Sequence, residues 1–456
     1  MDDNLQPHPV DTNDTTAPAT DTNTRQKPTS HIDITSTNSV SSTSDTENPF
    51  STNFVNPRLD PRHHDFSVRD WLANLVRFTA SHGVESNKYR HQQIGVCFRG
   101  LSVSGYGTPT DYQKTVSNVV LEITSLLRPR SSKANRKIPI LTDFDGVVSH
   151  GEMLLVLGRP GSGCSTLLKT VSRDIHGLSV EPDSYLNYSG IAPNVMRSQF
   201  RGEAIYMAEQ DVHFPQLTVD QTLSFAAKAR APPSGLFGDG VSRDAFAERL
   251  KDVAMAAFGL TGVAGTNVGN DLIKGVSGGE RKRVSIAEAM LSGSALQCWD
   301  NSTRGLDSAN AIEFCKTLKV AAELAGTTAL VALYQAPQAA YDVFDKVTLL
   351  HGGRQIYFGP SHDAAAYFEG LGFERAPRQT TPDFLTSVTS SERRVRAGKE
   401  SEVPRTPGEF VQRWKASTAY RSLMSDVQGF EERYPLDGPN VKELLEAKYS
   451  RQTRSQ

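Results

Sequence analysis

The chain has 456 residues, a length that allows two or three domains of ordinary size. Its 49 Lys and Arg residues nearly balance 51 Asp and Glu residues, so the composition implies no general attraction to nucleic acid or to an anionic membrane surface. The four cysteines show no metal-ligand spacing, and no apolar run approaches the roughly 18 residues that a membrane-spanning helix needs.

Residues 1 to about 60 are rich in Thr, Ser, Asn and Asp and poor in large apolar residues. Such a segment cannot bury enough apolar surface to offset the entropy that it would lose on ordering. We therefore expect residues 1–60 to form a disordered acidic tail. Whether this tail is phosphorylated or is a solvated tail with no specific function stays open.

Residues 61–92 have a different pattern, in which large apolar side chains recur at helical spacing. The residues concerned are Phe66, Val68, Trp71, Leu72, Leu75, Val76 and Phe78. The spacing predicts an amphipathic helix in this segment.

From residue 93 to about 360, predicted strands and helices alternate, which indicates an α/β domain around a mostly parallel sheet. "IGVCFRGLSVSGYG" predicts a strand and a turn, and the short apolar runs "EMLLVLG" and "TTALVALY" predict buried parallel strands. Within this domain, a Pro/Gly-rich hinge followed by a long helix favours a helical insertion at about 218–292. The basic stretch "RPRSSKANRK" is expected to be a solvated loop.

Residues 361–456 begin with a helical pattern, "HDAAAYFEGLGF". They continue as a polar, proline-punctuated segment, "VPRTPGEFVQRW", and end in "KELLEAKYSRQTRSQ".

A glycine-rich loop follows the first of the two apolar runs and precedes a predicted helix. It matches a phosphate-binding P-loop at every position except one, because Cys164 stands where the motif has lysine. Its glycines allow backbone amides to surround phosphate oxygens, and the hydroxyl of Ser165 can bind Mg²⁺. The alternative is an ordinary glycine turn between strand and helix. The residues of the loop are Gly158, Arg159, Pro160, Gly161, Ser162, Gly163, Cys164, Ser165 and Thr166.

Two further motifs follow in a fixed order. "VSGGE" opens a predicted helix, with Ser277 as a good N-cap and two glycines that allow close approach to a phosphate. "ALQCWDNSTRGLD" then reads as a hydrophobic strand ending in Asp300, a carboxylate placed to hold Mg²⁺ directly or through water. P-loop, "SGGE" and strand-Asp in this order are far more specific than any one of them.

These motifs resemble an ATP-binding cassette (ABC) domain, and in detail the first nucleotide-binding domain of fungal full-size ABCG transporters of the pleiotropic drug resistance (PDR) type. The similarity covers roughly residues 65–430. It implies a P-loop NTPase fold with a RecA-like core, an antiparallel β subdomain and a helical subdomain. The segments that carry it include "GRPGSGCST", "YMAEQDVHFPQLTVDQTLSFAA", "VSGGERKRVSIAEAML", "WDNSTRGLD", "ALYQAPQAAYDVFDKV" and "GGRQIYFGP".

Beside Cys164, the resemblance exposes three more departures from a working ATPase site. Asn301 stands where a glutamate would polarise the attacking water, and loss of a general base typically costs a factor of about 10²–10⁴. Tyr334 stands at the switch-histidine position, and its neutral phenol lacks the second ring nitrogen. Glu209 stands at the Q-loop position, although a register one residue later would place Gln210 there.

The resemblance implies that two cassettes sandwich ATP between the Walker motifs of one and the signature of the other. The expected signature residues are Ser277, Gly278, Gly279 and Glu280, and the expected D-loop residues, which cross the dimer seam, are Leu306 and Asp307. The chain would then bind ATP and Mg²⁺ with little hydrolysis and lend its signature to a second cassette. Phe144 and Tyr106 are candidates for stacking on adenine, and the alternative for each is an ordinary packed aromatic side chain.

The leading hypothesis is therefore the first cassette of a multidrug, xenobiotic or lipid exporter. Its expected partners are a second nucleotide-binding domain and transmembrane domains, which would handle the hydrophobic substrate; no nucleic-acid partner is expected. The fragment itself is expected to be soluble, at the cytoplasmic face of a membrane, such as the plasma membrane. The alternatives are a regulatory ABC module without transport and an ABC protein of a nucleic-acid machine. Whether the chain itself is an ATPase stays open.

Overall fold

A sheet of 10 strands runs through the part of the chain that the computed structural model describes, residues 46–51, 54–81, 93–106, 137–231, 241–438 and 441. The order across the sheet is β4 (Leu178–Val180), β1 (Val96–Tyr106), β2 (Lys137–Val148), β10 (Arg354–Pro360), β9 (Lys346–His351), β3 (Met153–Gly158), β8 (Thr328–Ala332), β7 (Leu296–Asp300) and β6 (Ala204–Met207). β5 (Tyr185–Asn187) pairs with β1 off this path.

One half of the sheet is parallel. β3 pairs with β8 and β9, β8 with β7, and β7 with β6, all in parallel. Every residue of β3, β7 and β8 is buried, and β3 and β8 are nearly continuous apolar runs, as expected of strands covered on both faces. The sequence prediction of buried parallel strands is confirmed here. Since parallel strands end at one edge of the sheet, the segments after β3, β7 and β8 lie at that edge.

The other half of the sheet is largely antiparallel. β1 pairs with β2, β4 and β5, and β10 pairs with β9, in antiparallel orientation. The strand predicted from "IGVCFRGLSVSGYG" is therefore confirmed as β1. An α/β cassette with a parallel core and an antiparallel β portion is the fold that the motifs predict. The stretch "RPRSSKANRK" lies outside the described residues.

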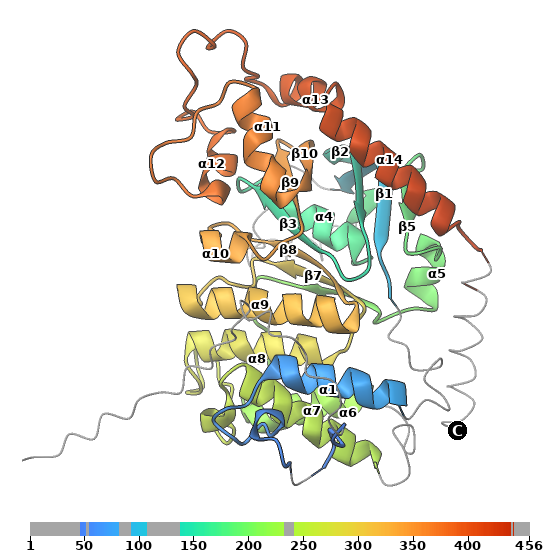
Figure 1. Ribbon diagram of the computed structural model, residues 1–456, viewed down its shortest axis with the longest axis vertical. Helices are drawn as coiled ribbons and strands as arrows, with labels where there is room; N and C mark the ends of the chain where they lie inside the picture. Colours follow the sequence, from blue (N-terminus) through green and yellow to red (C-terminus); the bar gives the residue numbers. More distant parts are fainter. Residues whose placement is uncertain are drawn as a thin grey trace, which may run out of the picture.

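Helices lie on both sides of this sheet (Figure 1). α6, α7 and α8 pack together below it, within the range where the sequence predicts a helical insertion, and α1 lies beside them. Among the described residues, no helix combines the length and the apolar character needed to cross a membrane. The helices are α1 (Val68–Ser81), α4 (Cys164–Val171), α5 (Pro193–Ser198), α6 (Val219–Arg230), α7 (Arg243–Ala257), α8 (Gly278–Leu291), α9 (Ser308–Ala325), α10 (Gln338–Tyr341), α11 (Ala364–Gly370), α12 (Thr381–Ser387), α13 (Pro407–Lys415) and α14 (Thr418–Arg433), with short 3₁₀ turns η1 (Pro57–Leu59), η2 (Thr261–Val263) and η3 (Ser361–Asp363).

The structure differs from the predicted tail at its C-terminal end. Phe50 and Leu59 are buried, the first against Phe246 and the second in a cluster with Trp71 and Val253. Average composition misses this segment because a few apolar side chains are enough to anchor it. The predicted disorder therefore does not extend to residue 60, and residues 1–45 lie outside the described residues.

The C-terminal region is more helical than its sequence suggests. The polar stretch "VPRTPGEFVQRW" contains α13, which begins after the N-cap Thr406 with Pro407 in its first turn. Proline is tolerated there because the first helical amides have no partner within the helix. α13 and α14 pack on β10, and α14 also packs on β1 and β2 (Figure 1). Residues 442–456 lie outside the described residues.

Candidate functional site

The glycine-rich loop lies between β3 and α4, as its motif predicts. Gly161 and Gly163 have φ angles of +84° and +101°, which side chains rarely tolerate, and Gly163 is the N-cap of α4. A Cβ atom on Gly163 would lie 2.5 Å from Leu141 Cδ2. The loop is therefore closely packed on β2 and places the first amides of α4 at the sheet edge, an arrangement suited to an anion.

Cys164 does not supply a cation to this loop. The residue is only 4% exposed, and its Sγ would lie 2.9 Å from a Cβ atom on Gly158. Burial, and then the charge of Asp300, raises the pKa of the Cys164 thiol to about 12. The thiol is therefore neutral and packed under the loop, where a P-loop lysine would carry a positive charge.

Asp300, at the end of β7, is a buried carboxylate with one free oxygen. Its Oδ2 accepts a hydrogen bond of 2.7 Å from the Tyr206 hydroxyl, whereas its Oδ1 is buried with no partner among the described residues. A buried oxygen left unpaired is costly, and Mg²⁺ prefers carboxylate oxygens. The residues present therefore fit a metal ion held by Asp300 and the Ser165 hydroxyl.

Tyr334, just after β8, lies beside these groups. Burial, and then the proximity of Cys164, Asp300 and Glu209, raises the pKa of the Tyr334 phenol, and a hydrogen bond with Ser165 opposes that rise. The phenol is therefore neutral at physiological pH. The structure thus brings the P-loop, Asp300 and Tyr334 to one place.

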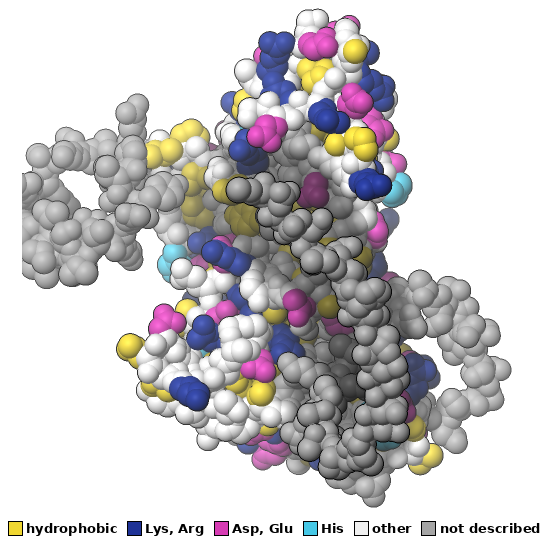
Figure 2. Space-filling model, turned by 90° about the vertical axis from the view of Figure 1, so that its left-hand side faces the viewer, with side chains coloured by type: hydrophobic (Ala, Val, Ile, Leu, Met, Phe, Trp, Pro, Cys, Tyr) yellow, Lys and Arg dark blue, Asp and Glu magenta, His cyan; other side chains and the backbone are white. Residues whose placement is uncertain are grey.

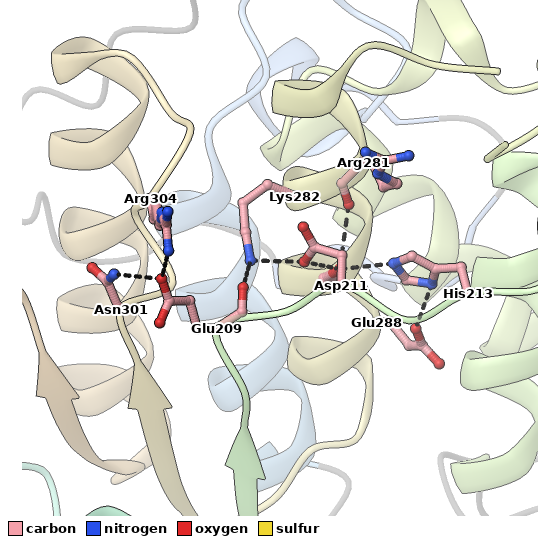
Figure 3. A network of polar contacts seen from close by, with 9 residues as sticks. Glu209, Asp211, His213, Arg281, Lys282, Glu288, Asn301 and Arg304 are labelled. Carbon is pink, nitrogen blue, oxygen red and sulfur yellow. Dashed lines mark hydrogen bonds and ion pairs between the residues drawn. The ribbon is translucent and has the colours of Figure 1, made fainter. Parts of the chain in front are cut away.

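Asn301 and Glu209 hold each other at the same edge (Figure 3). Asn301 Nδ2 donates to Glu209 Oε1 over 3.2 Å, and the Arg304 guanidinium donates to the same oxygen. Asn301 has a φ angle of +47°, a conformation that asparagine adopts more readily than most residues. The Glu209 carboxylate therefore already accepts hydrogen bonds from two donors of its own chain.

The residues expected to form the signature lie at the start of α8, in the group formed by α6, α7 and α8 rather than at the P-loop (Figure 1). Ser277 and Glu280 form a capping box: Ser277 N donates to Glu280 Oε2 over 2.9 Å, and Glu280 N donates to Ser277 Oγ over 3.3 Å. Ser277 and Gly278 are exposed, and among the described residues no atom beyond the chain neighbours and helix backbone of Gly278 comes within 4 Å of a Cβ atom placed on it. This corner of the chain is therefore open to a ligand or partner.

The predicted D-loop residues precede α9. Asp307 is the N-cap of this helix, and its Oδ1 accepts from Asn310 N over 2.8 Å. This backbone hydrogen bond, the largest cause, lowers the pKa of the Asp307 carboxyl. Asp307 therefore has a capping role within the chain, and Leu306, beside it, is half-buried.

Two residues of the site were not predicted from the sequence: Tyr206, which donates to Asp300, and Arg304, which donates to Glu209. Each lies within a quoted motif segment, but no local spacing shows its partner. One proposed residue is wrong, since Phe144 is fully buried in the core and has no face to offer adenine. The Tyr106 side chain lies outside the described residues.

Comparison with known proteins identifies two families in the chain. Residues 20–119 match the ABC-transporter N-terminal family, and residues 141–304 match the ABC transporter family. The chain is 54% identical to the ABC multidrug transporter C of Aspergillus fumigatus, over 91% of this chain and 28% of that protein. It is 51% identical to the ABC-type transporter oblD of Cochliobolus heterostrophus, over 92% of this chain and 27% of the relative. The ABC multidrug transporter AFR2 of Cryptococcus neoformans is also 51% identical, over 87% and 25%. The chain thus spans less than a third of each of these relatives.

Proposed function

We propose that this chain, which belongs to the ABC transporter family, is the first cassette of a fungal exporter of the PDR type. Its ABC-transporter N-terminal and ABC transporter domains support this proposal. An ABC transporter domain binds ATP, generally with Mg²⁺. The named relatives are multidrug or ABC-type transporters, which supports export of a hydrophobic small molecule or lipid by membrane domains. A plasma-membrane location is part of the same proposal.

The proposed cassette holds nucleotide without turning it over usefully. The loop amides and the start of α4 bind phosphate, Ser165 and Asp300 hold Mg²⁺, and the bound ion supplies charge neutralisation at the phosphates. Because Cys164 replaces the P-loop lysine, the site lacks a charged hydrogen bond to phosphate, which would contribute about 1.5–3 kcal/mol. Asn301 can orient water through its amide but cannot take a proton from it. The observation that carries the proposal is that Cys164 of the P-loop is buried and neutral.

The exposed start of α8, which we call the signature corner (Ser277 to Glu280), is proposed to complete the ATP site of a second cassette. Its exposure and its capping box support this, since the helix start is ordered while its glycines remain accessible. Val212, Phe214 and Phe225 are 85%, 75% and 73% exposed, an apolar set that supports contact with a membrane domain. On the face drawn in Figure 2, basic and acidic side chains are interspersed among the described residues, which favours this reading over nucleic-acid binding.

The proposal is tested by measuring Mg-ATP binding and turnover by the purified chain. We expect binding in the high-micromolar range or weaker and negligible phosphate release. Cys164→Lys should bind more tightly by roughly 10- to 100-fold, the equivalent of one charged hydrogen bond, and should still not hydrolyse ATP. Cys164→Met is the matched control for side-chain size. Robust turnover by the unmodified chain would overturn the degenerate-site proposal, and unchanged affinity in Cys164→Lys would show that the missing charge is not limiting.

A further inference from the structure

The segment after β6 lies along one face of α8 (Figure 3). Its alternate residues Glu209, Asp211 and His213 each contact that helix, while Val212 and Phe214 between and after them are exposed. The helix residues that meet them are Lys282, Ser285 and Glu288, which are spaced by three and so lie on one face. We call the range 209–214 the Q-segment.

Lys282 is the centre of this contact. The residue is 4% exposed, and its Nζ donates to the backbone carbonyl of Glu209 over 2.7 Å and lies 2.8 Å from Asp211 Oδ1. A buried ammonium without such partners would be strongly destabilising. The Glu209 carbonyl and the Asp211 carboxylate are therefore held next to Lys282. Asp211 is in turn held by the Ser285 hydroxyl over 2.6 Å, one turn further along α8.

His213 continues the same pattern. Its Nε2 lies 2.7 Å from Ser285 Oγ, and its Nδ1 lies 3.4 Å from Glu288 Oε2. Its side chain is only 3% exposed, so the contact is packed as well as polar. The Q-segment and α8 are therefore joined along three successive positions of the helix face.

Glu209 links this unit to the chain's own nucleotide pocket. Its carboxylate accepts from Asn301 and Arg304, after β7, whereas its carbonyl accepts from Lys282 of α8. Ser277 and Gly278 stand one turn before Lys282 on the same helix. A displacement at the pocket edge can therefore reach the signature corner through a single residue and one buried ammonium.

We propose that Lys282 is a positioning residue that couples the chain's own nucleotide pocket to the signature corner at Ser277 and Gly278. The functional consequence of this coupling rests on the proposed function, in which a second cassette uses the signature corner. The coupling itself belongs to this chain. With Lys282 in place, the Q-segment and the start of α8 move together; without it, they move separately.

The test is hydrogen exchange on the full chain, read in peptides covering residues 277–286. In the absence of nucleotide, Lys282→Met should raise exchange there about tenfold or more, as loss of a charged hydrogen bond would, while β3 and β8 stay protected. Arg281→Met is the matched control, because Figure 3 shows that side chain pointing away from the network. Lys282→Arg should restore slow exchange, since a guanidinium can donate to both acceptors. Equal exchange in Lys282→Met and Arg281→Met would overturn the positioning role.

A second arm adds Mg²⁺ and a non-hydrolysable ATP analogue. In the unmodified chain, both residues 158–166 and residues 277–286 should gain protection; in Lys282→Met, only residues 158–166 should. Protection of both regions in Lys282→Met would overturn the coupling. If residues 158–166 gain no protection in the unmodified chain, nucleotide binding itself fails, and the coupling fails with it, while the nucleotide-free arm still decides whether Lys282 positions α8. If Lys282→Met does not fold, both experiments are repeated with Asp211→Asn, which changes the less buried partner of the pair.

Discussion

At the scale of single residues, the side chains of Glu209, Asn301 and Arg304 meet in one polar contact. Asn301 donates to Glu209, and Arg304 donates to the same carboxylate oxygen. A glutamate at position 301 would place a second carboxylate against the first. Residues 209 and 301 are therefore a matched pair, and a glutamate at position 301 alone would create a conflict between two carboxylates.

We expect Asn301→Glu to destabilise the chain rather than restore hydrolysis. The left-handed backbone at φ +47° disfavours glutamate by about 1–2 kcal/mol, and the like charges of the two carboxylates add to that cost. Urea unfolding measures the change. Asn301→Asp is the control, because aspartate tolerates this backbone and adds the charge alone. The double variant with Glu209→Gln should recover the repulsive part; no recovery would show that residues 209 and 301 are not coupled.

At the scale of elements, the antiparallel half of the sheet is fastened to α14 by a buried acid. Asp145 is 2% exposed; its Oδ2 accepts from the Tyr420 hydroxyl over 2.8 Å, and its Oδ1 accepts from Gly100 N over the same distance. Burial, followed by this hydrogen bond, raises the pKa of the Tyr420 phenol. The hydroxyl therefore stays a donor, and α14 is held where it crosses β1 and β2 (Figure 1).

Tyr420→Phe should lower the free energy of unfolding by about 1–3 kcal/mol, because it removes the hydroxyl donor from Asp145 Oδ2 and leaves that oxygen only the Lys415 ammonium, 3.9 Å away. Chemical denaturation gives this value, and exchange of the α14 amides locates it. Tyr434→Phe, near the end of the same helix, is the control, since the ring contact of Tyr434 with Phe430 survives the change. A loss no larger than that of the control would mean that the Asp145 contact does not hold α14.

The sequence predicts the elements whose signals are local. β3 and β8 follow from unbroken apolar runs, the P-loop from its glycine spacing, and the cap of α8 from Ser277 followed by Glu280. The network around Lys282 could not be predicted, because its partner carbonyl lies 73 residues away in the chain. α13 was missed because a proline that starts a helix resembles one that breaks it. Packing partners, unlike periodicity, are set only by the assembled fold.

At the scale of the whole molecule, the described residues 46–51 and 54–66 form an arm that packs on α7. Phe50 lies against Phe246 of α7 with ring centroids 5.2 Å apart, and Leu59 and Trp71 pack with Val253 of the same helix. α1, which follows the arm, packs on α9, where Arg69 lies 3.0 Å from Glu323. The arm and α1 together therefore contact both α7 and α9.

Arg249 of α7 adds a polar contact and a cation–π contact to these apolar contacts with the arm. It is 6% exposed, its guanidinium donates to the backbone carbonyl of Ser51, and it lies 4.9 Å from the ring centroid of Phe54. Burial lowers the pKa of this guanidinium, so its partners must offset a real cost of desolvation. Removing the guanidinium therefore leaves the Ser51 carbonyl and the Phe54 ring without their shared partner.

We expect Arg249→Met to release the arm, with faster proteolytic cleavage between residues 46 and 66 and a loss of about 1–3 kcal/mol in the free energy of unfolding. Arg62→Met is the matched control in the arm itself: that side chain is 68% exposed and lies 3.8 Å from Asp252, so its removal should cost less than about 1 kcal/mol. If both variants are cleaved at the rate of the unmodified chain, the arm is held by its apolar contacts alone. In that case Phe50→Ala, which removes the contact with Phe246, should release the arm, because the arm would then be held on α7 by the aromatic rings rather than by the buried guanidinium.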